Sequence, residues 1–115
     1  MCQCPRLVFY LAPYQSVGCW KDTGSRAIAT LEGKDNRLDG SYGLRINPIQ
    51  KCHEVAKSRG FKYFAIQHGG WCASSAGAEQ TYKKYGTASN CQNGEGGGWA
   101  NDVYAIKEEC KFVLQ

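Results

Sequence analysis

The chain has 115 residues, of which 43% are hydrophobic and 21% charged, and its formal net charge is +4. This length suits one domain, and the balance of apolar and charged residues excludes a disordered chain. The charge is mild and forms no block of basic residues, which argues against nucleic-acid binding. The apolar run at residues 7–12 is too short for a signal-peptide core or a membrane span.

Seven cysteines predict a disulfide-stapled domain from an oxidising, extracellular compartment. Most are widely separated in the sequence, which suits staples between distant elements better than the paired spacings of zinc sites. Because seven is odd, one cysteine stays free or links a second chain, and Cys2 or Cys4 near a terminus is the expected spare. The seven are Cys2, Cys4, Cys19, Cys52, Cys72, Cys91 and Cys110.

The first third of the chain is predicted to form short strands followed by a long loop. Residues 7–12 predict a strand that Pro13 ends, and residues 17–20 predict the end of a second strand. A turn follows at residues 21–25. The polar, glycine-punctuated segment 31–47 is too long for a featureless loop in a compact domain, so we expect it to be ordered and functional.

The clearest predicted helix covers residues 48–59. Asn47 is a suitable N-cap, Pro48 suits the first helical position, and Gly60 ends the helix. Apolar residues recur on one face, so Cys52 should point inward. That face consists of Ile49, Cys52, Val55 and Ala56.

The second half predicts a hairpin, a short helix and a final strand, and so an α+β domain with one main helix packed on an antiparallel sheet. The segments are a strand at 61–67, a turn at 68–70, a strand from 71–73, a helix at 78–85, a glycine-rich loop at 90–98 and a strand at 103–106.

Several segments resemble a WSC-type domain, a cysteine-rich extracellular module. They are Gly18-Cys19-Trp20-Lys21-Asp22 with Arg26-Ala27-Ile28, Ile49-Gln50-Lys51-Cys52, residues 60–67 with Gly70-Trp71-Cys72, Cys91 in its glycine-rich loop, and Asn101-Asp102-Val103-Tyr104. The resemblance covers residues 15–106, between an N-terminal strand segment at 1–14 and a tail at 107–115. It implies a PAN/apple-like fold, with a helix on a curved antiparallel sheet, and extracellular glycan binding.

The sequence departs from this family at Ala56 and at Ala73 and Ser74, where the family usually carries further cysteines. We expect a staple between the inner face of the helix and the strand after the hairpin, joining Cys52 to Cys72. Cys19 with Cys91 is the next expected pair. Cys110 with Cys4 or Cys2 would clasp the termini.

Metal and catalytic sites are the less favoured alternatives. His68 and Cys72, with Cys52 and His53, lack preset zinc geometry, so a turn histidine and a structural cystine are favoured. The segment from Asp35 to Asp39 could hold Ca²⁺, but a solvated turn is favoured. No nucleophile or metalloprotease motif is present, and nothing places two carboxylates across a cleft. We therefore expect a protein that is not an enzyme and has no cofactor.

The aromatic residues carry the functional prediction, because the tryptophans adjoin turns or glycine-rich loops. Sugar faces stack on exposed rings, and amides or carboxylates bind the hydroxyls. Core burial is an equally good interpretation for Trp20 and Trp71, whereas Trp99 follows three glycines and is the better exposed candidate. The expected ligand-binding residues are Gln67, His68, Trp71, Tyr82, Tyr85, Trp99, Asn101 and Asp102.

These patterns predict a secreted, lectin-like module whose partner is a glycan. A shallow site binds single sugars weakly, so tandem copies or self-association through the spare cysteine would supply avidity. The alternative is an extracellular adhesion or protein-interaction domain that uses the same loops without binding sugar. A toxin is less favoured, because the chain lacks an amphipathic cationic helix.

Overall fold

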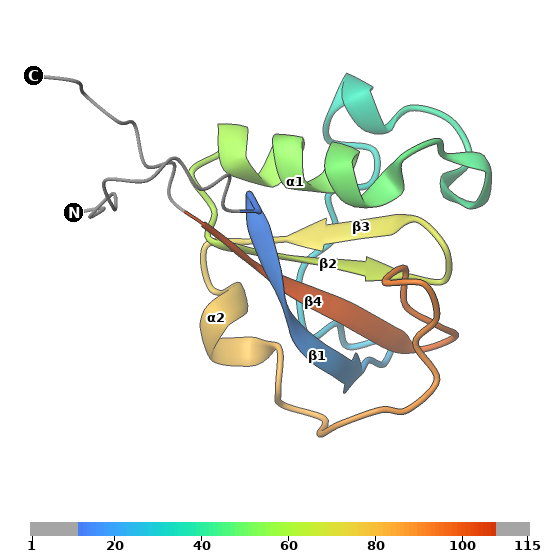
Figure 1. The fold of residues 1–115 in the computed structure, drawn as a ribbon, viewed down its shortest axis with the longest axis vertical. Helices are drawn as coiled ribbons and strands as arrows, with labels where there is room; N and C mark the ends of the chain where they lie inside the picture. The colour runs from blue at the N-terminus through green and yellow to red at the C-terminus, as the bar shows by residue number, and fades with distance from the viewer. Residues whose placement is uncertain (1–11, 108–115) are drawn as a thin grey trace, which may run out of the picture.

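The computed structural model describes residues 12–107, which form a four-stranded antiparallel sheet with one main helix (Figure 1). The strand order is β1-β4-β2-β3. The elements are β1 (Tyr14–Lys21), η1 (Asn36–Leu38), η2 (Tyr42–Leu44), α1 (Pro48–Ser58), β2 (Tyr63–Gln67), β3 (Trp71–Ser74), α2 (Ala78–Thr81) and β4 (Ala100–Ile106). This arrangement confirms the small disulfide-stapled α+β class.

The longest pairing joins the first and last strands of the described chain. β1 and β4 pair antiparallel from Tyr14 opposite Ile106, and the amide of Lys107 donates to the carbonyl of Pro13 at 2.8 Å. The two ends of the described segment therefore lie side by side. A bulge interrupts β1 at Gly18, whose φ of 112° is a backbone conformation that glycine adopts without strain.

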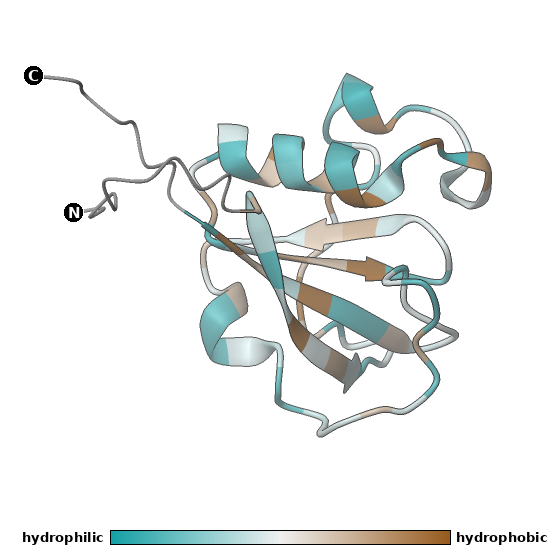
Figure 2. Cartoon of the chain, in the orientation of Figure 1, coloured by the Kyte–Doolittle hydropathy of each residue, from teal (hydrophilic) through white to brown (hydrophobic). Residues whose placement is uncertain are grey.

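One face of the sheet is closed by α1. Cys52 and Val55 on the helix are fully buried against Phe64 and Ile66 on β2. The predicted disulfide from Cys52 to Cys72 ties the helix to β3, with a Cα–Cα distance of 5.5 Å. Figure 2 shows hydrophobic colours concentrated in the strands and mostly hydrophilic colours on the outer turns of α1. This face is the larger apolar core.

The bounds of α1 follow the sequence closely, but its N-terminal cap does not. Pro48 takes the first position as predicted, whereas Asn47 is left-handed, with φ 52°, and its side chain makes no capping hydrogen bond. At the other end, Gly60 is left-handed, and the amide of Phe61 donates to the carbonyl of Ala56 at 3.0 Å. This is the Schellman arrangement that the glycine predicted.

The other face is covered by α2 and by the segment around Ile28. Ile28, Ala65, Tyr82 and Val103 are buried together there. The predicted helix over 78–85 is shorter in the structure, because after Thr81 the chain tightens into turns up to the left-handed Gly86. Tyr82, at the end of α2, still donates its amide to the carbonyl of Ala78, and its ring is buried in the core.

The long loop at 31–47 is ordered around an ion pair whose arginine is buried. Both terminal nitrogens of Arg45 contact the carboxylate of Glu32, at 2.7 and 2.8 Å. Arg45 also donates to the carbonyl of Gly70 at 2.7 Å, and Glu32 accepts from the amide of Cys72 at 2.8 Å. The loop is therefore fastened to the hairpin of β2 and β3, which places Tyr42 beside the hairpin turn.

Other predictions fall outside the described residues. They are the pairing of Cys110 with Cys4 or Cys2, the spare cysteine, and most of the strand at 7–12, of which only Ala12 is described. Among the helices within residues 12–107, none has the length and apolar character to cross a membrane.

Candidate functional site

The candidate site begins with a row of side chains that crosses the sheet on the face away from α1. Trp20, Asn101, Gln67 and Trp71 stand opposite one another on β1, β4, β2 and β3. Residues directly opposite in antiparallel strands share a face. The row lies near the point where β1 ends and the chain turns at Asp22, so the site lies at one end of this face.

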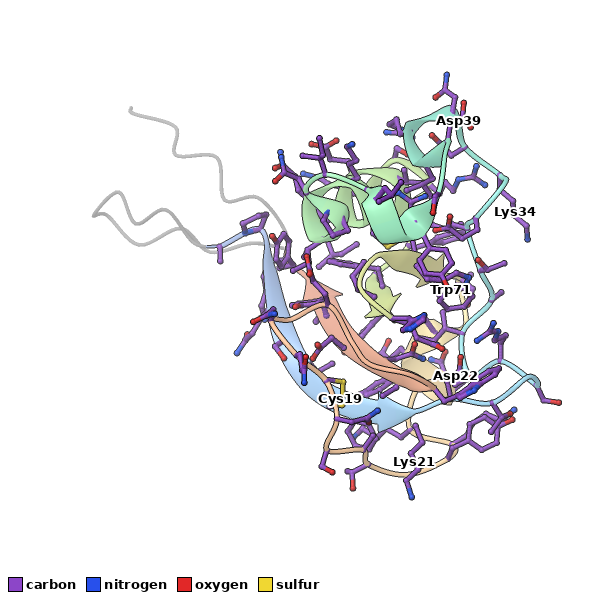
Figure 3. The ribbon with its side chains drawn as sticks, turned by 90° about the vertical axis from the view of Figure 1, so that its right-hand side faces the viewer. Cys19, Lys21, Asp22, Lys34, Asp39 and Trp71 are labelled. Carbon is purple, nitrogen blue, oxygen red and sulfur yellow. A yellow bond between two sulfur atoms is a disulfide. The ribbon has the colours of Figure 1, made fainter. Side chains whose placement is uncertain are left out.

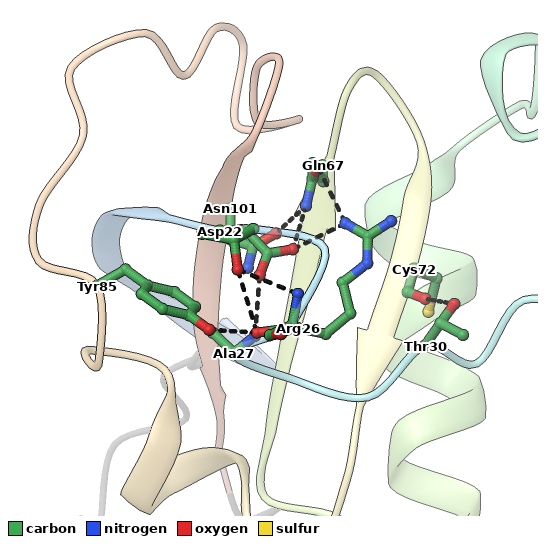
Figure 4. Close-up of polar contacts among 10 residues, drawn as sticks. Asp22, Arg26, Ala27, Thr30, Gln67, Cys72, Tyr85 and Asn101 are labelled. Carbon is green, nitrogen blue, oxygen red and sulfur yellow. Dashed lines mark hydrogen bonds and ion pairs between the residues drawn. The ribbon is translucent and has the colours of Figure 1, made fainter.

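Asp22 organises the polar part of the site (Figure 4). Its carboxylate accepts from the amide of Ala27 at 2.8 Å, from Nη1 of Arg26 at 2.9 Å and from Nε2 of Gln67 at 2.8 Å. Burial opposes ionisation of Asp22, but these hydrogen bonds outweigh it and hold the pKa of its carboxyl below the ordinary value of 3.8. The site thus contains a buried carboxylate that stays ionised at neutral pH.

Gln67 connects this carboxylate to the middle of the sheet. Its Nε2 also donates to Oδ1 of Asn101 at 2.9 Å, and its Oε1 lies 3.5 Å from Nη1 of Arg26. Asn101 is fully buried, and its Nδ2 has no hydrogen-bond partner among residues 12–107. The network therefore fixes the Gln67 amide from both sides and leaves one buried donor of Asn101 unused.

Arg26 carries the network to the surface, between two tryptophans. Its guanidinium carbon lies 4.3 Å from the centroid of the Trp71 ring and 5.0 Å from that of Trp99. Such distances are typical of cation–π contacts. The side chain of Arg26 is 34% exposed, and Figure 3 shows Trp71 above Asp22 on the side that faces the viewer. The two rings and the guanidinium form a surface cluster that we call the Trp–Arg–Trp cluster.

The backbone at this cluster is strained at two residues. Trp99 has φ 53° and His68 has φ 51°, a left-handed conformation that bulky residues rarely adopt. Trp99 is the second central residue of a turn closed by reciprocal hydrogen bonds between Gly97 and Ala100, a position that favours glycine or asparagine. Strain of this kind concentrates at functional sites. Trp99 is 56% exposed at this position.

A pocket of about 380 Å³ lies at the cluster. It is lined by Arg26, Tyr42, Gln67, His68, Trp71, Gly98 and Trp99. The hydroxyl of Tyr42 lies 3.2 Å from Nδ1 of His68, so the loop at 31–47 supplies one wall. The pocket combines aromatic faces with an amide, a guanidinium and an imidazole. Such a combination binds small polar molecules that also have apolar faces.

The glycine-rich loop beside the pocket is fastened from the α1 face of the sheet. Oδ2 of Asp102 accepts from the amide of Gly96 at 2.8 Å, and the hydroxyl of Tyr104 donates to the carbonyl of Gly94 at 2.6 Å. Burial raises the pKa of Tyr104 to about 12, so its hydroxyl remains a donor at physiological pH. The predicted disulfide from Cys19 to Cys91 anchors the start of the loop.

The structure gathers some of the predicted ligand-binding residues and separates others. Gln67, His68, Trp71 and Trp99 line the pocket. Tyr85 lines a neighbouring hollow and donates to the carbonyl of Ser25. The other three predicted residues do not line the pocket. Tyr82 is buried in the core, Asn101 lies behind Gln67, and Asp102 binds the glycine-rich loop.

Sequence reasoning did not select three residues that the structure places at the site. Asp22 and Arg26 are four positions apart and carry opposite charges, and that pattern could have indicated a local ion pair. Tyr42 lies in the loop predicted to be functional, but nothing in the sequence points to its contact with His68.

Several residues considered as possible metal ligands have other partners in the structure. Cys52 and Cys72 are joined in a disulfide, so neither thiolate is available for zinc. The carboxylate of Asp35 contacts Arg37 at 2.9 Å and Arg59 at 3.7 Å, and Arg37 holds the pKa of Asp35 well below its ordinary value. Within residues 12–107, no three His, Cys, Asp or Glu side chains converge as metal ligands would.

The chain was also compared with known proteins. No protein-family model matches it, and no curated protein matches it significantly.

Proposed function

We propose that this protein is a small secreted, non-enzymatic module that binds glycans at the Trp–Arg–Trp cluster. The observation that carries the proposal is Trp99, an exposed tryptophan held in a strained left-handed turn beside a second tryptophan. Folding alone gives no reason to place a large ring there, because a glycine or asparagine would fit the turn better. An exposed ring is suited to stacking on the apolar face of a sugar.

The polar groups around the rings support the same ligand class. Both N–H groups of the Gln67 amide are donated to Asp22 and Asn101, so its Oε1 is held in one orientation as an acceptor for a ligand hydroxyl. Only Nη1 of Arg26 has hydrogen-bond partners within residues 12–107, which leaves Nη2 for a ligand hydroxyl. Fixed polar groups are effective in binding because little conformational entropy is lost on association. The sequence resemblance to WSC-type domains and the two disulfides fit a secreted glycan-binding module.

A protein-interaction domain is the second candidate, and a separate observation favours it. Leu44 and Ile46, in and beside η2, are 84% and 73% exposed, and large exposed apolar side chains mark contact surfaces. Tryptophan and arginine, which form the cluster, are also enriched at protein interfaces. The two candidates differ in which residues they need, because sugar binding requires Trp99 and does not require Leu44.

A glycan-array screen tests the proposal with three forms of the oxidised protein: wild type, Trp99→Asn and Leu44→Ser. Asparagine tolerates the left-handed backbone, so Trp99→Asn removes the ring without disturbing the turn. We expect selective binding by wild type and by Leu44→Ser, and loss of that binding in Trp99→Asn.

Two results would contradict the proposal. The first is absence of binding to every glycan by a protein whose near-ultraviolet circular dichroism shows native packing. The second is glycan binding that survives in Trp99→Asn, which would place the sugar elsewhere. Loss of binding in Leu44→Ser alone would transfer the site to the η2 loop.

A further inference from the structure

Three hollows meet at the tip of the glycine-rich loop. Besides the pocket at the Trp–Arg–Trp cluster, a hollow of about 740 Å³ lies between the start of the turn after β1 and the segment 85–90, and one of about 490 Å³ lies against residues 92–97. Gly98 lines all three, and Trp99 lines both the pocket and the larger hollow. Each volume lies in the range of about 300–1,000 Å³ found for small-molecule sites.

Gly98 differs from the two preceding glycines in the space that surrounds the position of a Cβ atom. A Cβ at Gly96 would collide with the carbonyl oxygen of Ile66, and one at Gly97 would collide with that of Asn90. These two glycines are therefore required by close backbone packing. A Cβ at Gly98 would meet nothing within 4 Å, and the backbone there does not have a positive φ. The fold does not require glycine at Gly98, and a side chain there would project where the three hollows join.

The lining of the two flanking hollows indicates what would lie in them. The larger hollow is lined by the hydroxyl-bearing residues Thr23, Thr87 and Ser89, and the smaller one by the amide-bearing residues Gln92 and Asn93. The charges nearly cancel, since Lys21 lines one hollow, Glu95 lines the other, and Arg26 is paired with Asp22. Hydroxyls and amides without net charge match the hydroxyl-rich surface of a neutral sugar chain.

We infer that the ligand is a linear, neutral oligosaccharide that crosses Trp99 and continues through the junction at Gly98 into the flanking hollows. This inference rests on the proposed glycan-binding function and specifies its ligand. One sugar unit stacks at the Trp–Arg–Trp cluster, and the units on either side lie in the flanking hollows. Affinity therefore rises with chain length within a single site, without a second copy of the protein.

Isothermal titration calorimetry with oligosaccharides of one to six units tests the inference. Two neutral series, of β-linked glucose and of N-acetylglucosamine, are compared with an acidic series of galacturonic acid. We expect the Kd for the better neutral series to fall by at least about tenfold between one and four units, equivalent to about 1.4 kcal/mol of added contact. The acidic series should bind more weakly than that neutral series.

Gly98→Val is the diagnostic variant and Gly77→Val is its control. Gly77 also has open space around the position of a Cβ and no positive φ, but it lines none of the hollows. We expect Gly98→Val to bring the ratio of the Kd values for one and four units close to one, whereas Gly77→Val should behave as wild type. Matching urea midpoints for both variants and wild type would show that the fold is intact.

The outcomes separate this inference from the proposed function. If the monosaccharide binds as tightly as the hexamer, or if Gly98→Val retains the full length dependence, the extended site is wrong and the glycan-binding proposal stands. Tighter binding of the acidic series would contradict the neutral ligand. If no member of any series binds the folded protein, both the inference and the proposed function fail.

Discussion

Two arginine–carboxylate pairs fasten loops to this sheet, and they differ in how far the arginine is exposed. Arg45 is 2% exposed and binds Glu32 through both terminal nitrogens, while also donating to the carbonyls of Gly70 and Leu38. Arg26 is 34% exposed and contacts Asp22 through one nitrogen only. In the first pair the arginine is enclosed, whereas in the second the carboxylate is enclosed and the arginine reaches the surface.

The difference separates a structural role from a functional one for the same pair of residue types. A fully enclosed guanidinium is directed only at the protein's own carbonyls and carboxylates, so Arg45 can only hold the long loop in place. The open guanidinium of Arg26 has unused donors and stacks between two rings, so it can meet a ligand. Substitutions in the two pairs should therefore differ in their effects on stability.

Removal of Arg45 should have the largest effect. Arg45→Met removes the donor to the 20%-exposed carboxylate of Glu32 and to the carbonyls of Gly70 and Leu38, so we expect a loss at the lower end of the about 3–5 kcal/mol that breaking a buried pair costs. The measurement is the free energy of unfolding from urea denaturation at pH 7 with the disulfides intact. Arg37→Met, which breaks an exposed pair with Asp35, is the control and should change stability far less, because solvent screens exposed ion pairs. Equal effects of the two variants would contradict the structural role of Arg45.

Replacement of Asp22 should have an intermediate effect. Asp22→Asn keeps the shape of the side chain but presents an amide group to donors from Ala27, Arg26 and Gln67. Buried donors that lose a charged acceptor lower stability by about 1–3 kcal/mol. The same denaturation experiment measures this loss. A variant as stable as wild type would show that the network contributes nothing to folding.

Acid titration sharpens the prediction for Asp22. Because the pKa of Asp22 in the folded protein lies below 3.8, the ionised carboxylate contributes fully to stability at pH values above 3.8. This contribution to stability is lost as the pH falls through the pKa of the folded protein. The stability difference between wild type and Asp22→Asn should therefore shrink below about pH 4. Urea denaturation repeated from pH 7 down to pH 2 measures it. A difference that stays constant over this range would contradict the depressed pKa.

Replacement of Trp99 should have the smallest effect on stability. Trp99→Asn loses a cation–π contact of about 0.5–1 kcal/mol, and it relieves a left-handed strain of about 1–2 kcal/mol. We expect the free energy of unfolding to change by less than about 1 kcal/mol, in contrast to the 3–5 kcal/mol typical of a core aromatic such as Phe64. Phe64→Ala measured in parallel provides the comparison. A large loss in Trp99→Asn would mean that the ring supports the fold.

The parts of the fold that the sequence predicted are those set by neighbouring residues. The helix at Pro48–Ser58 has Pro48 at its start and Gly60 after its end, and the hairpin of β2 and β3 has its turn at His68–Gly70. The staple from Cys52 to Cys72 followed from the inner face of that helix. The cap at Asn47 could not be foreseen, because the backbone there is left-handed instead of extended.

The candidate site was predicted less completely because it depends on contacts between residues far apart in the sequence. Gln67 contacts Asp22 across 45 positions, and nothing in either local sequence indicates that contact. Trp99 was expected to be exposed, but its positive φ was not predicted. That backbone conformation arises from the turn closed by Gly97 and Ala100. Tyr82 was assigned to the site because it lies near a loop, whereas its ring stacks on Tyr63 in the core.

The most direct test of the central claim follows the indole signals of the tryptophans by proton–nitrogen NMR during titration with cellohexaose, laminarihexaose and chitohexaose. Trp20 is an internal reference, because it lines none of the three hollows and its indole nitrogen donates to the carbonyl of Val17 at 3.0 Å within the protein. The account predicts that at least one oligosaccharide shifts the signals of Trp99 and Trp71 and leaves that of Trp20 unchanged. Titrations in which no indole signal moves, or in which Trp20 moves and Trp99 does not, would contradict it.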